Sequence, residues 1–378
     1  MNIGIDINEA NVGQRVGVNQ VAFELFRSLV KVNKKHQIIA LSKQSPLPDF
    51  PPADKNLSYE VFGPGKAWVL TGLTKRLWFG KPKLDILFSP SHYTPLLTRT
   101  PTVIDIMDLS YEHFGNEYFT NYDLNQLKRW TPLSAKKARH IITISKFSKQ
   151  EIVRLYKVKE NKITVIYPGL NEDLFHPKIP KTKQIQVRNK YAITGKYFVY
   201  IGTLQPRKNL TRLIEAFALL LKSKASGTRF LKLVIVGKRG WLYEEINEKA
   251  NKLKIEDRVI FTGFAPSEDL PALMKGSLAY VLPSLYEGFG MPIVEAQAVC
   301  TPIITSRVSS LPEIAGSSAF YIDDPQSTKQ IKDALKEVLN LKKDKRKEVI
   351  EQGKQNAGRF NWQNSATQLL KLLEKIKN

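Results

Sequence analysis

Short apolar runs alternate, along almost the whole chain, with segments in which apolar residues recur every three or four positions. The short runs predict β-strands, and the longer period predicts amphipathic helices. In the first expected helix, Val21, Leu25 and Leu29 are spaced by four, with Ala22 and Phe26 beside them. This alternation is typical of parallel sheets covered by helices, so we expect an α/β protein.

The expected strands fall into two series. The first series comprises Ile3–Ile7, Gln37–Leu41, Ile86–Ser89, Thr102–Ile106, His140–Ile144 and Lys162–Ile166. The second comprises Tyr197–Ile201, Lys232–Val236, Val259–Thr262, Leu278–Leu282 and Pro302–Thr305. Further helices are expected at Leu210–Leu221, Asp333–Leu341 and Ala366–Ile376.

A stretch without hydrophobic period separates the two series. Asn171–Lys190 contains Pro177, Pro180 and several lysines, which predicts a linker. A length of 378 residues suits two domains. We predict an N-terminal domain over residues 1–180, a C-terminal domain over residues 190–358, and a helix over residues 359–378 that packs back toward the first domain. Two such sheets should face a cleft, with ligands beyond the carboxyl ends of the strands.

The charge of the chain bears on its partners. Lys and Arg number 58 against 35 Asp and Glu, a net charge of +23, and both sides of residue 180 are basic. Spread charge favours contact with polyanions or anionic membranes, although a basic proteome or solubility explains it equally well. No nucleic-acid-binding module is recognisable, so no nucleic acid partner is expected.

Other features of the composition bear on location. The single cysteine, Cys300, fits a reducing compartment, and we expect no signal peptide because the first residues already have the pattern of a strand. No apolar run approaches the roughly 20 residues of a membrane span. We expect a cytoplasmic protein, with peripheral contact at the inner face of the membrane left open.

Three glycine-containing loops follow expected strands. "GTLQPRKN" (Gly202 to Asn209) places two adjacent cations near a helix start, where a diphosphate can bind, although an ordinary capping turn has the same composition. "NVGQRVGVNQ" (Asn11 to Gln20) lacks the dinucleotide fingerprint, and "VGKRGW" (Val236 to Trp241) is explained equally well by a turn that needs glycine.

A fourth loop, "SLYEGFGMPIVEA" (Ser284 to Ala296), carries two glutamates. Pro292 suits the first turn of a helix, and we expect Glu295 in that turn and Glu287 in the loop before it. A carboxylate in such a loop can accept hydrogen bonds from sugar hydroxyls, but it can also be a solvated turn residue. Glu295 can likewise serve the helix dipole alone.

Together these motifs resemble glycosyltransferase family 4, the retaining nucleotide-sugar transferases of the GT-B fold. The resemblance includes the three second-half loops, "FTGF" (Phe261–Phe264) and "SSLPEIAGSSAFYIDDP" (Ser309–Pro325). In the first half it includes "MDLSYEHF" (Met107–Phe114), "TISKFSKQEI" (Thr143–Ile152) and "VIYPGL" (Val165–Leu170). It implies two Rossmann-like parallel-sheet domains facing a central cleft. The N-terminal domain would be on the acceptor side and the C-terminal domain would bind the donor, a nucleotide diphosphate sugar; the acceptor would be a glycan or lipid-linked.

The resemblance also implies roles for individual residues. Arg207 and Lys208 would bind the donor diphosphate, Glu287 would contact the transferred sugar, and Glu295 would hold the ribose. Further donor-binding positions are Gly17 in the first domain and, in the second, Gly202, Lys238, Gly263, Phe264, Gly288, Phe289, Gly290 and Met291. The departing phosphate would take the acceptor's proton, so no protein nucleophile, metal or other cofactor is expected.

One position departs from the family pattern. Many relatives have histidine before the Asp-Leu of this motif, where this chain has Met107, and methionine neither donates a strong hydrogen bond nor changes its charge. His92 and His113 are the nearest imidazoles in sequence, although a single histidine is more often structural. Asp108 remains as a candidate catalytic residue.

The function expected from the sequence is transfer of a hexose with retained anomeric configuration. "MDLSYEHF" and "PRKN" most resemble members that use GDP-mannose, which favours mannosyl transfer in polysaccharide or glycolipid assembly. Three alternatives remain: a UDP-sugar donor, a nucleotide-sugar-binding protein with weak or lost transfer, and another GT-B chemistry such as a phosphorylase or epimerase. "KAWVLTGLTKRLWF" (Lys66 to Phe79) can meet a membrane or lipid-linked acceptor, or can be a helix packed on its sheet.

Overall fold

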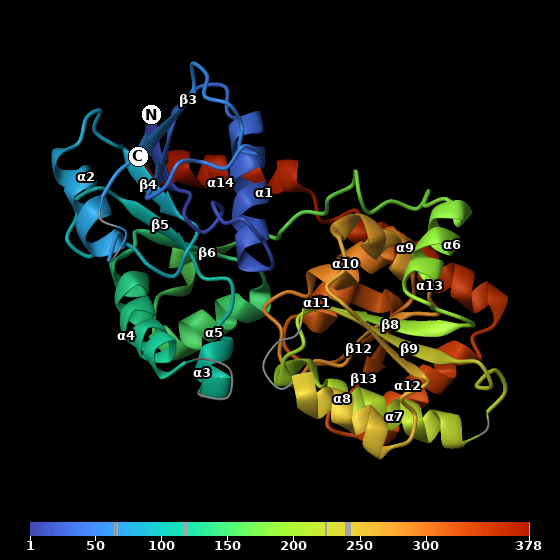
Figure 1. Cartoon of the computed structure of the whole chain (residues 1–378). Helices are drawn as coiled ribbons and strands as arrows, with labels where there is room; N and C mark the ends of the chain where they lie inside the picture. Colours follow the sequence, from blue (N-terminus) through green and yellow to red (C-terminus); the bar gives the residue numbers. More distant parts are fainter. Residues whose placement is uncertain (64, 66, 116–119, 224, 239–242, 378) are drawn as a thin grey trace. The chain divides into compact units, whose positions relative to one another are not determined.

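The chain forms two compact units. The computed structural model describes residues 1–63, 65, 67–115, 120–223, 225–238 and 243–377. Met1–Gly169 and Asn361–Asn378 make the first unit, and Leu170–Phe360 make the second. Each unit is built on one parallel sheet with helices (Figure 1), which confirms the expected α/β class with two Rossmann-like domains.

The first sheet has seven strands in the order β3-β2-β1-β4-β5-β6-β7, and all neighbours are parallel. The strands are β1 (Asn2–Asp6), β2 (Gln37–Ser42), β3 (Leu57–Val61), β4 (Ile86–Ser89), β5 (Thr102–Asp105), β6 (His140–Thr143) and β7 (Ile163–Val165). Successive side chains of a strand point to opposite faces, so strands buried on both faces need apolar residues at nearly every position.

Both faces of this sheet are buried. Ile3, Ile5 and Phe88 belong to the core on one face, with α1 (Val18–Val32) and α14 (Trp362–Lys377). Ile39 and Leu87 belong to a core on the other face. The helices and turns associated with this second face are η1 (Val69–Leu73), α2 (Thr74–Phe79), α3 (Ser110–Phe114), α4 (Asn121–Lys137), α5 (Lys146–Tyr156) and η3 (Glu160–Lys162).

The last helix of the chain belongs to the first unit. Ala366, Leu369 and Leu373 of α14 are fully buried in the core that α1 shares, although the second unit separates the two helices in sequence. Spacings of three and four residues along α14 place these side chains on one stripe of the helix.

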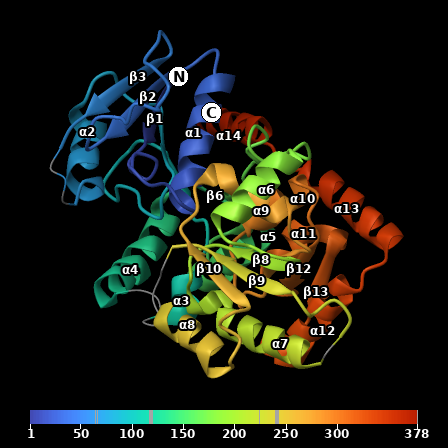
Figure 2. The same ribbon diagram turned by 45° about the vertical axis from the view of Figure 1, so that its right-hand side comes forward.

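The second sheet has six parallel strands in the order β10-β9-β8-β11-β12-β13. They are β8 (Tyr197–Ile201), β9 (Lys232–Val236), β10 (Val259–Gly263), β11 (Tyr280–Leu282), β12 (Ile303–Ser306) and β13 (Ala319–Ile322). Figure 2 shows this sheet between two groups of helices. One group is α7 (Leu210–Lys222), α8 (Tyr243–Lys252) and α12 (Thr328–Leu339); the other is α6 (Lys181–Lys190), α9 (Leu270–Lys275), α10 (Met291–Ala298), α11 (Leu311–Ala315) and α13 (Lys343–Ala357).

The expected strands are all present, within two residues at each end, but two further strands lie at sheet edges. β3 and β13 are partly exposed, so they lack the continuous apolar run that marks a buried strand. The linker prediction was wrong over Lys181–Lys190, which forms α6. This helix buries only Val187 among its described residues, and its Lys183 and Lys190 form ion pairs with Asp269, a contact that a local period cannot indicate.

The segment from Lys66 to Phe79, in which cations and tryptophans are interleaved, has a buried side and an exposed side. Leu73 and Leu77 pack in a core of the first unit, and Arg76 is buried beside Glu60, as a helix packed on its sheet requires. Trp78 and Phe79 are 41% and 76% exposed. Lys66, at the start of this segment, lies outside the described residues.

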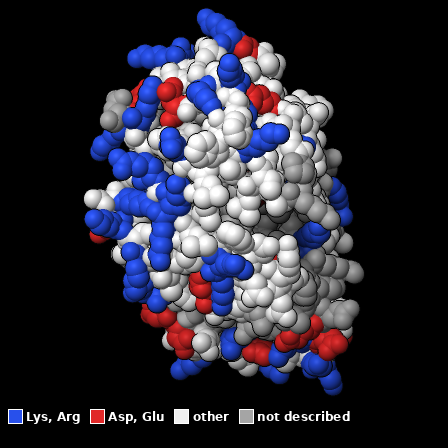
Figure 3. All heavy atoms as spheres, turned by 90° about the vertical axis from the view of Figure 1, so that its left-hand side faces the viewer, with Lys and Arg blue, Asp and Glu red and all other residues white. Residues whose placement is uncertain are grey.

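Basic side chains are spread over the surface. On the face drawn in Figure 3, Lys and Arg lie over much of the area rather than in a single cluster. In the described part of the chain, no helix combines the length and apolar character that a membrane span requires.

Candidate functional site

Two of the loops identified in the sequence meet at one point of the second sheet. The strand order reverses between β8 and β11, which are neighbours although three crossovers separate them in sequence. The loop after β8 contains Arg207 and Lys208, and the loop after β11 contains Glu287. Ligands of open parallel sheets bind beyond the carboxyl ends of the strands at such a reversal.

The backbone around the two cations is fixed. Pro206–Lys208 form a short 3-10 turn, η4, that ends at Asn209 in the left-handed region (φ 62°). Asn209 is buried, and its side-chain Nδ2 donates to the carbonyls of Pro283 at 3.1 Å and Pro325 at 2.6 Å. The amide of Leu285 donates to the carbonyl of Arg207 at 2.8 Å. The two loops are therefore joined by the Asn209 side chain and by one main-chain hydrogen bond.

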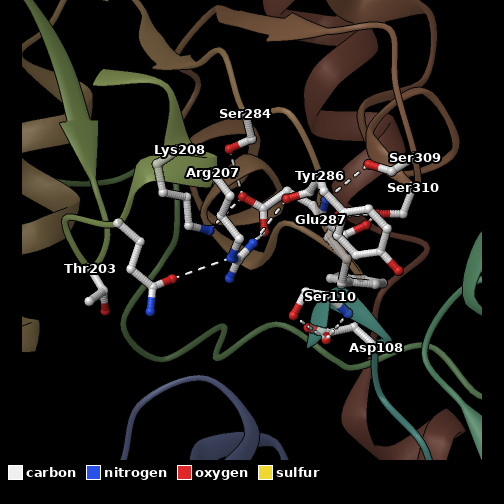
Figure 4. Close-up of polar contacts among 12 residues, drawn as sticks. Asp108, Ser110, Thr203, Arg207, Lys208, Ser284, Tyr286, Glu287, Ser309 and Ser310 are labelled. Atoms are coloured by element: carbon white, nitrogen blue, oxygen red, sulfur yellow. Dashed lines mark hydrogen bonds and ion pairs between the residues drawn. The ribbon is translucent and has the colours of Figure 1, made fainter. Parts of the chain in front are cut away.

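Glu287 joins the two cations (Figure 4). Lys208 Nζ lies 2.5 Å from Glu287 Oε1, and Arg207 Nη1 lies 2.9 Å from Glu287 Oε2. Ser284 Oγ donates to Glu287 Oε1 at 2.7 Å, and Arg207 also donates to the carbonyl of Tyr286 at 2.9 Å. The structure thus brings together three of the four predicted catalytic residues in one cluster.

The protonation state of the cluster follows from its charges. Glu287 is 5% exposed, so the solvated-turn alternative for this residue is wrong. Burial alone would raise the pKa of Glu287, but the charges of Lys208 and Arg207 and the hydrogen bonds from Lys208 and Ser284 hold it at about 2. The carboxylate is therefore ionised at physiological pH, and it orients the Lys208 ammonium and the Arg207 guanidinium at the edge of the sheet.

Serines that the sequence reasoning missed support this loop. Glu287 N donates to Ser309 Oγ at 3.0 Å, and Ser310 Oγ donates to the carbonyls of Glu287 at 2.8 Å and Phe289 at 3.1 Å. Ser309 and Ser310 fix the loop together with Asn209 and Ser284. All four side chains are polar; Ser309 is partly buried and the other three are buried. Ser309 and Ser310 contact residues more than 20 positions away in the chain. No spacing in the sequence therefore indicates these contacts.

Glycines let three strand ends come close together. The amide of Gly237 donates to the carbonyl of Gly263 at 2.9 Å, and a Cβ on Gly237 would lie 1.8 Å from the carbonyl oxygen of Gly202. Only glycine fits such an approach. The ends of β8, β9 and β10 therefore form a continuous backbone edge, next to which Lys238 and Phe264 are exposed. Residues 239–241 of the "VGKRGW" loop lie outside the described residues.

The second glutamate lies deeper in its helix than expected. Gly290, in the left-handed region (φ 101°), precedes α10, which begins at Met291 and has Pro292 in its first turn. Glu295 is the fifth residue of α10, so the prediction that it lies in the first turn was wrong by one position in the helix. It is half-buried, and burial raises its pKa to about 7.

The remaining predicted site residues lie in the first unit. Gly17 precedes α1 with φ 53°, and a Cβ there would meet nothing within 4 Å. Asp108 accepts hydrogen bonds from the Ser110 amide at 3.0 Å and hydroxyl at 2.9 Å. Met107 is buried, and its carbonyl accepts from Ser148 Oγ at 3.1 Å.

The two candidate histidines have different surroundings. His92 Nδ1 lies 3.5 Å from the Tyr111 hydroxyl. Burial lowers the pKa of His92, and the negative charge of Asp108 offsets only part of this effect. His113 Nε2 lies 2.5 Å from Glu151, which also pairs with Arg154. His113 is therefore held by a hydrogen bond to a carboxylate that also pairs with Arg154.

Two protein-family models match the chain. The model described as Glycosyltransferase Family 4 matches residues 16–174, and the model described as Glycosyl transferases group 1 matches residues 182–356. The chain is also 30% identical over 265 residues to O-antigen chain mannosyltransferase RfbU of Salmonella typhimurium (strain LT2), a match that covers 70% of this chain and 67% of the relative. The chain belongs to glycosyltransferase family 4. In this family 4 glycosyltransferase, each model match falls almost entirely within one structural unit.

A second relative of the family 4 glycosyltransferase is O-antigen chain mannosyltransferase B of Escherichia coli. It is 31% identical over 256 residues, which cover 67% of this chain and 65% of the relative. The match thus spans slightly less than two thirds of that relative's length.

Solved structures resemble the family 4 glycosyltransferase over nearly its whole length. WaaG, a glycosyltransferase involved in lipopolysaccharide biosynthesis, has a TM-score of 0.73 and 16% identity, with 98% of this chain and 99% of that chain covered. Anabaena Alr3699/HepE, solved in complex with UDP and glucose, has a TM-score of 0.76 and 17% identity, with 99% and 100% covered. At these identities the likeness shows the GT-B fold.

Proposed function

We propose that this chain transfers a hexose from a nucleoside diphosphate sugar to a hydroxyl of a glycan or glycolipid. The observation that carries the proposal is the cluster of Arg207, Lys208 and Glu287 at the reversal point of the second sheet. Two oriented cations and one carboxylate match a ligand that has a diphosphate at one end and hydroxyls beside it.

The cluster suits the charge change of such a transfer. Breaking the bond between sugar and diphosphate leaves an additional negative charge on the leaving phosphate. Arg207 and Lys208 are held in place by Glu287, by Tyr286 and by the η4 turn, so they need little reorganisation when this charge appears. Such preorganised stabilisation is usually the largest contribution to a rate enhancement.

The donor we favour is GDP-mannose. The two relatives from Escherichia coli and Salmonella typhimurium described above are mannosyltransferases, and the motifs resemble members that use this donor. A UDP-sugar is the second candidate, since the structurally similar Anabaena protein was solved with UDP and glucose. The backbone edge at the ends of β8, β9 and β10, with Gly202 and Gly263 in it and Lys238 beside it, is the expected place for the base, with Phe264 next to it.

We further propose that the anomeric configuration is retained and that no metal or other cofactor takes part. In this mechanism the acceptor hydroxyl attacks from the face that the diphosphate leaves, and the leaving phosphate takes the proton. Glu295 would bind the ribose hydroxyls, and Gly288, Phe289, Gly290 and Met291 would offer backbone to the donor. Gly17 and Asp108 of the first unit stay predictions from the family resemblance.

A lipid-linked acceptor fits one surface of the first unit. Trp78, Phe79 and Leu97 are exposed, and Trp78 Nε1 donates to the carbonyl of Leu97 at 2.7 Å. The guanidinium of Arg99 lies 5.5 Å from the centre of the Trp78 ring. We call these four residues the Trp78 patch. Exposed aromatic residues beside cations suit the interface of an anionic membrane, so we propose a cytoplasmic protein with peripheral membrane contact.

The test is an assay of the purified chain with GDP-mannose, UDP-glucose, UDP-galactose and UDP-N-acetylglucosamine, each with glycan and glycolipid acceptors. Release of the diphosphate that depends on acceptor supports transfer, and NMR of the new glycosidic bond establishes its configuration. Donor binding without release across the panel would instead support a nucleotide-sugar-binding protein, the alternative that Met107 motivates. Product formed without acceptor would support an epimerase.

A further inference from the structure

A pocket lined by basic side chains lies at the amino ends of two strands of the first sheet. Its volume is about 650 Å³, and its lining comes from α4, β6, β7, α14 and the segment between α5 and β7, all within the first unit. His140 is the first residue of β6, and Lys162 is the last residue before β7. Substrates of such sheets bind at the opposite edge, beyond the carboxyl ends of the strands. We call this pocket the basic pocket.

The charged residues that line the basic pocket are all cations. Its described lining contains no Asp or Glu and six basic residues, which are Lys136, Arg139, Lys157, Lys159, Lys162 and Lys375. None of these six pairs with a carboxylate in the described part of the chain, whereas nearby Lys149 pairs with Glu160 at 3.3 Å. Like charges around one pocket repel each other, and a bound anion relieves that repulsion.

Helix ends account for one of the six cations. Lys162 Nζ donates to the carbonyls of Ala135 and Lys136, in the last turn of α4, at 2.8 Å each. Cations stabilise helix C-termini in this way. Within the described residues, none of the other five side chains forms such a hydrogen bond to a carbonyl. Helix capping therefore explains Lys162 and leaves five cations whose charge is not matched.

His140 shows that these cations act on one point. Its Nε2 lies 2.8 Å from Thr164 Oγ1, which fixes the ring in the wall of the pocket. Burial lowers the pKa of His140 to about 4, and the charges of Lys162, Lys375 and Arg139 add to this effect. The residues that carry these charges come from the segment before β7, from α14 and from the connection between α4 and β6. Cations that are far apart in the chain thus share one small region.

The rest of the lining limits the kind of anion. Val158, Leu372 and Ile376 pack against the cores of the first unit, and no aromatic side chain occurs among the described lining residues. A nucleobase would therefore find no stacking partner. Lys and Arg form strong charge-assisted hydrogen bonds with phosphate oxygens. One phosphate group carries about two negative charges, so a single group does not match five cations.

We propose that the basic pocket binds an anion with two or more phosphate groups. The ligand is not a reactant of the proposed transfer, because the pocket lies at the amino ends of the strands, and the inference does not rest on that function. A ligand held by Lys136, Lys159 and Lys375 would join α4, the segment before β7 and α14. Its binding should therefore stabilise the first unit, whose core α14 completes.

This phosphate chemistry has two sources, a free oligophosphate and the headgroup of an anionic lipid. Lys137, beside Lys136 in α4, donates through Nζ to the carbonyl of Thr98 at 2.9 Å, and Thr98 lies between Leu97 and Arg99 of the Trp78 patch. A lipid headgroup could therefore reach the pocket from a membrane bound at that patch. A free oligophosphate needs no membrane, so the two sources are separable by experiment.

The experiment titrates the full chain with sodium tripolyphosphate at constant ionic strength. Calorimetry should show binding, the melting temperature should rise, and the NMR signal of the His140 ring, assigned with His140→Gln, should shift. The double variant Lys159→Gln/Lys375→Gln should weaken binding about tenfold, because it removes two cations that contact the ligand. Lys208→Ala removes binding at the candidate donor site of the other unit and should leave the His140 shift unchanged.

The matched control is Lys343→Gln/Lys347→Gln, which removes two exposed cations of α13 in the second unit and so changes the net charge equally. This variant should bind tripolyphosphate like the unaltered chain. Equal affinities of the two double variants would overturn the proposal, since binding would then follow net charge alone.

Vesicles of phosphatidylcholine and cardiolipin, a lipid with two phosphate groups, test the second source. Vesicle binding that Lys159→Gln/Lys375→Gln loses and the control keeps, without binding of tripolyphosphate, would uphold the phosphate site and assign it to a lipid headgroup. Absence of binding to the pocket in both titrations would overturn the proposal. A chain that binds tripolyphosphate there but transfers no sugar would uphold the pocket and contradict the proposed function.

Discussion

Glu287 Oε1 lies 2.5 Å from Lys208 Nζ, although the two residues are 79 positions apart in the chain. The same carboxylate holds Arg207 at 2.9 Å. The candidate donor site of the second unit is therefore a single electrostatic unit, in which each member fixes the position of the others before a ligand arrives. Substitutions within it should not act independently.

Removing either member of this pair should impair transfer strongly. We expect Lys208→Ala and Glu287→Ala each to lower kcat/KM by about 10²–10³, since each loses oriented charge next to the leaving diphosphate. The double variant should be little worse than either single variant. Steady-state kinetics of the three proteins, with urea unfolding to confirm the fold, measures this.

The matched control is the pair of Lys249 and Glu215, which has the same 2.5 Å separation in the same unit but lies away from the cluster. Lys249→Ala should leave kcat/KM unchanged. Turnover by Lys208→Ala and Glu287→Ala at the rate of the unaltered chain would refute the assignment of the cluster.

Glu295 should make stability depend on pH. Its carboxyl ionises near pH 4.5 when unfolded and near pH 7 when folded, because burial disfavours the charged form. Between these two pH values the folded state binds more protons than the unfolded state. The protonated carboxyl's contribution to the free energy of unfolding is therefore complete below about pH 4.5, and it is lost as the pH rises to about 7. Glu295→Gln removes the titration.

We therefore compare the free energy of unfolding of Glu295→Gln with that of the unaltered chain at two pH values. We expect the variant's advantage to be about 2 kcal/mol larger at pH 8 than at pH 5. Urea unfolding at the two pH values measures this. Glu256→Gln, at an exposed position, should show the same small difference at both. A difference for Glu295→Gln that does not change with pH would show that the carboxyl is hydrated in the folded protein.

Gly237 should tolerate no side chain. A Cβ there would lie 1.8 Å from the Gly202 carbonyl oxygen, a main-chain atom that cannot move without displacing β8. We expect Gly237→Ala to lower the free energy of unfolding by about 3 kcal/mol and to weaken nucleotide binding. Gly13→Ala, whose Cβ would meet nothing within 4 Å, is the control for unfolding. Equal melting temperatures for the two variants would contradict the close approach.

The Trp78 patch should bind anionic membranes. We expect sedimentation of the chain with vesicles containing 30 mol% anionic lipid, weakened several-fold by Phe79→Ser or Leu97→Ser because each removes exposed apolar surface. Phe230, which is 66% exposed beside Arg229 in the other unit, gives the control Phe230→Ser. If all three variants sediment equally, the patch has no part in membrane binding.

The strands were predictable because burial on both faces imposes continuous apolar runs such as Tyr197–Ile201. The edge strand β13 was not, since its exposed positions relax that demand. The positions of Arg207, Lys208 and Glu287 after strands were also readable. Their direct ion pairs were not, because contacts between residues 79 and 80 positions apart depend on which strands are neighbours. For the same reason the "GTLQPRKN" motif contained Asn209 but did not indicate that its side chain joins the loops after β8 and β11.

The placement of α14 has a consequence for how the chain is made. Ala366, Leu369 and Leu373 complete the core of the first unit, yet they are translated after the whole of the second. The second unit has all its residues in one continuous segment and can fold as soon as that segment has left the ribosome. The unit whose synthesis begins first is thus the unit that finishes folding last. Until α14 is made, the apolar surface of α1 that α14 covers stays exposed.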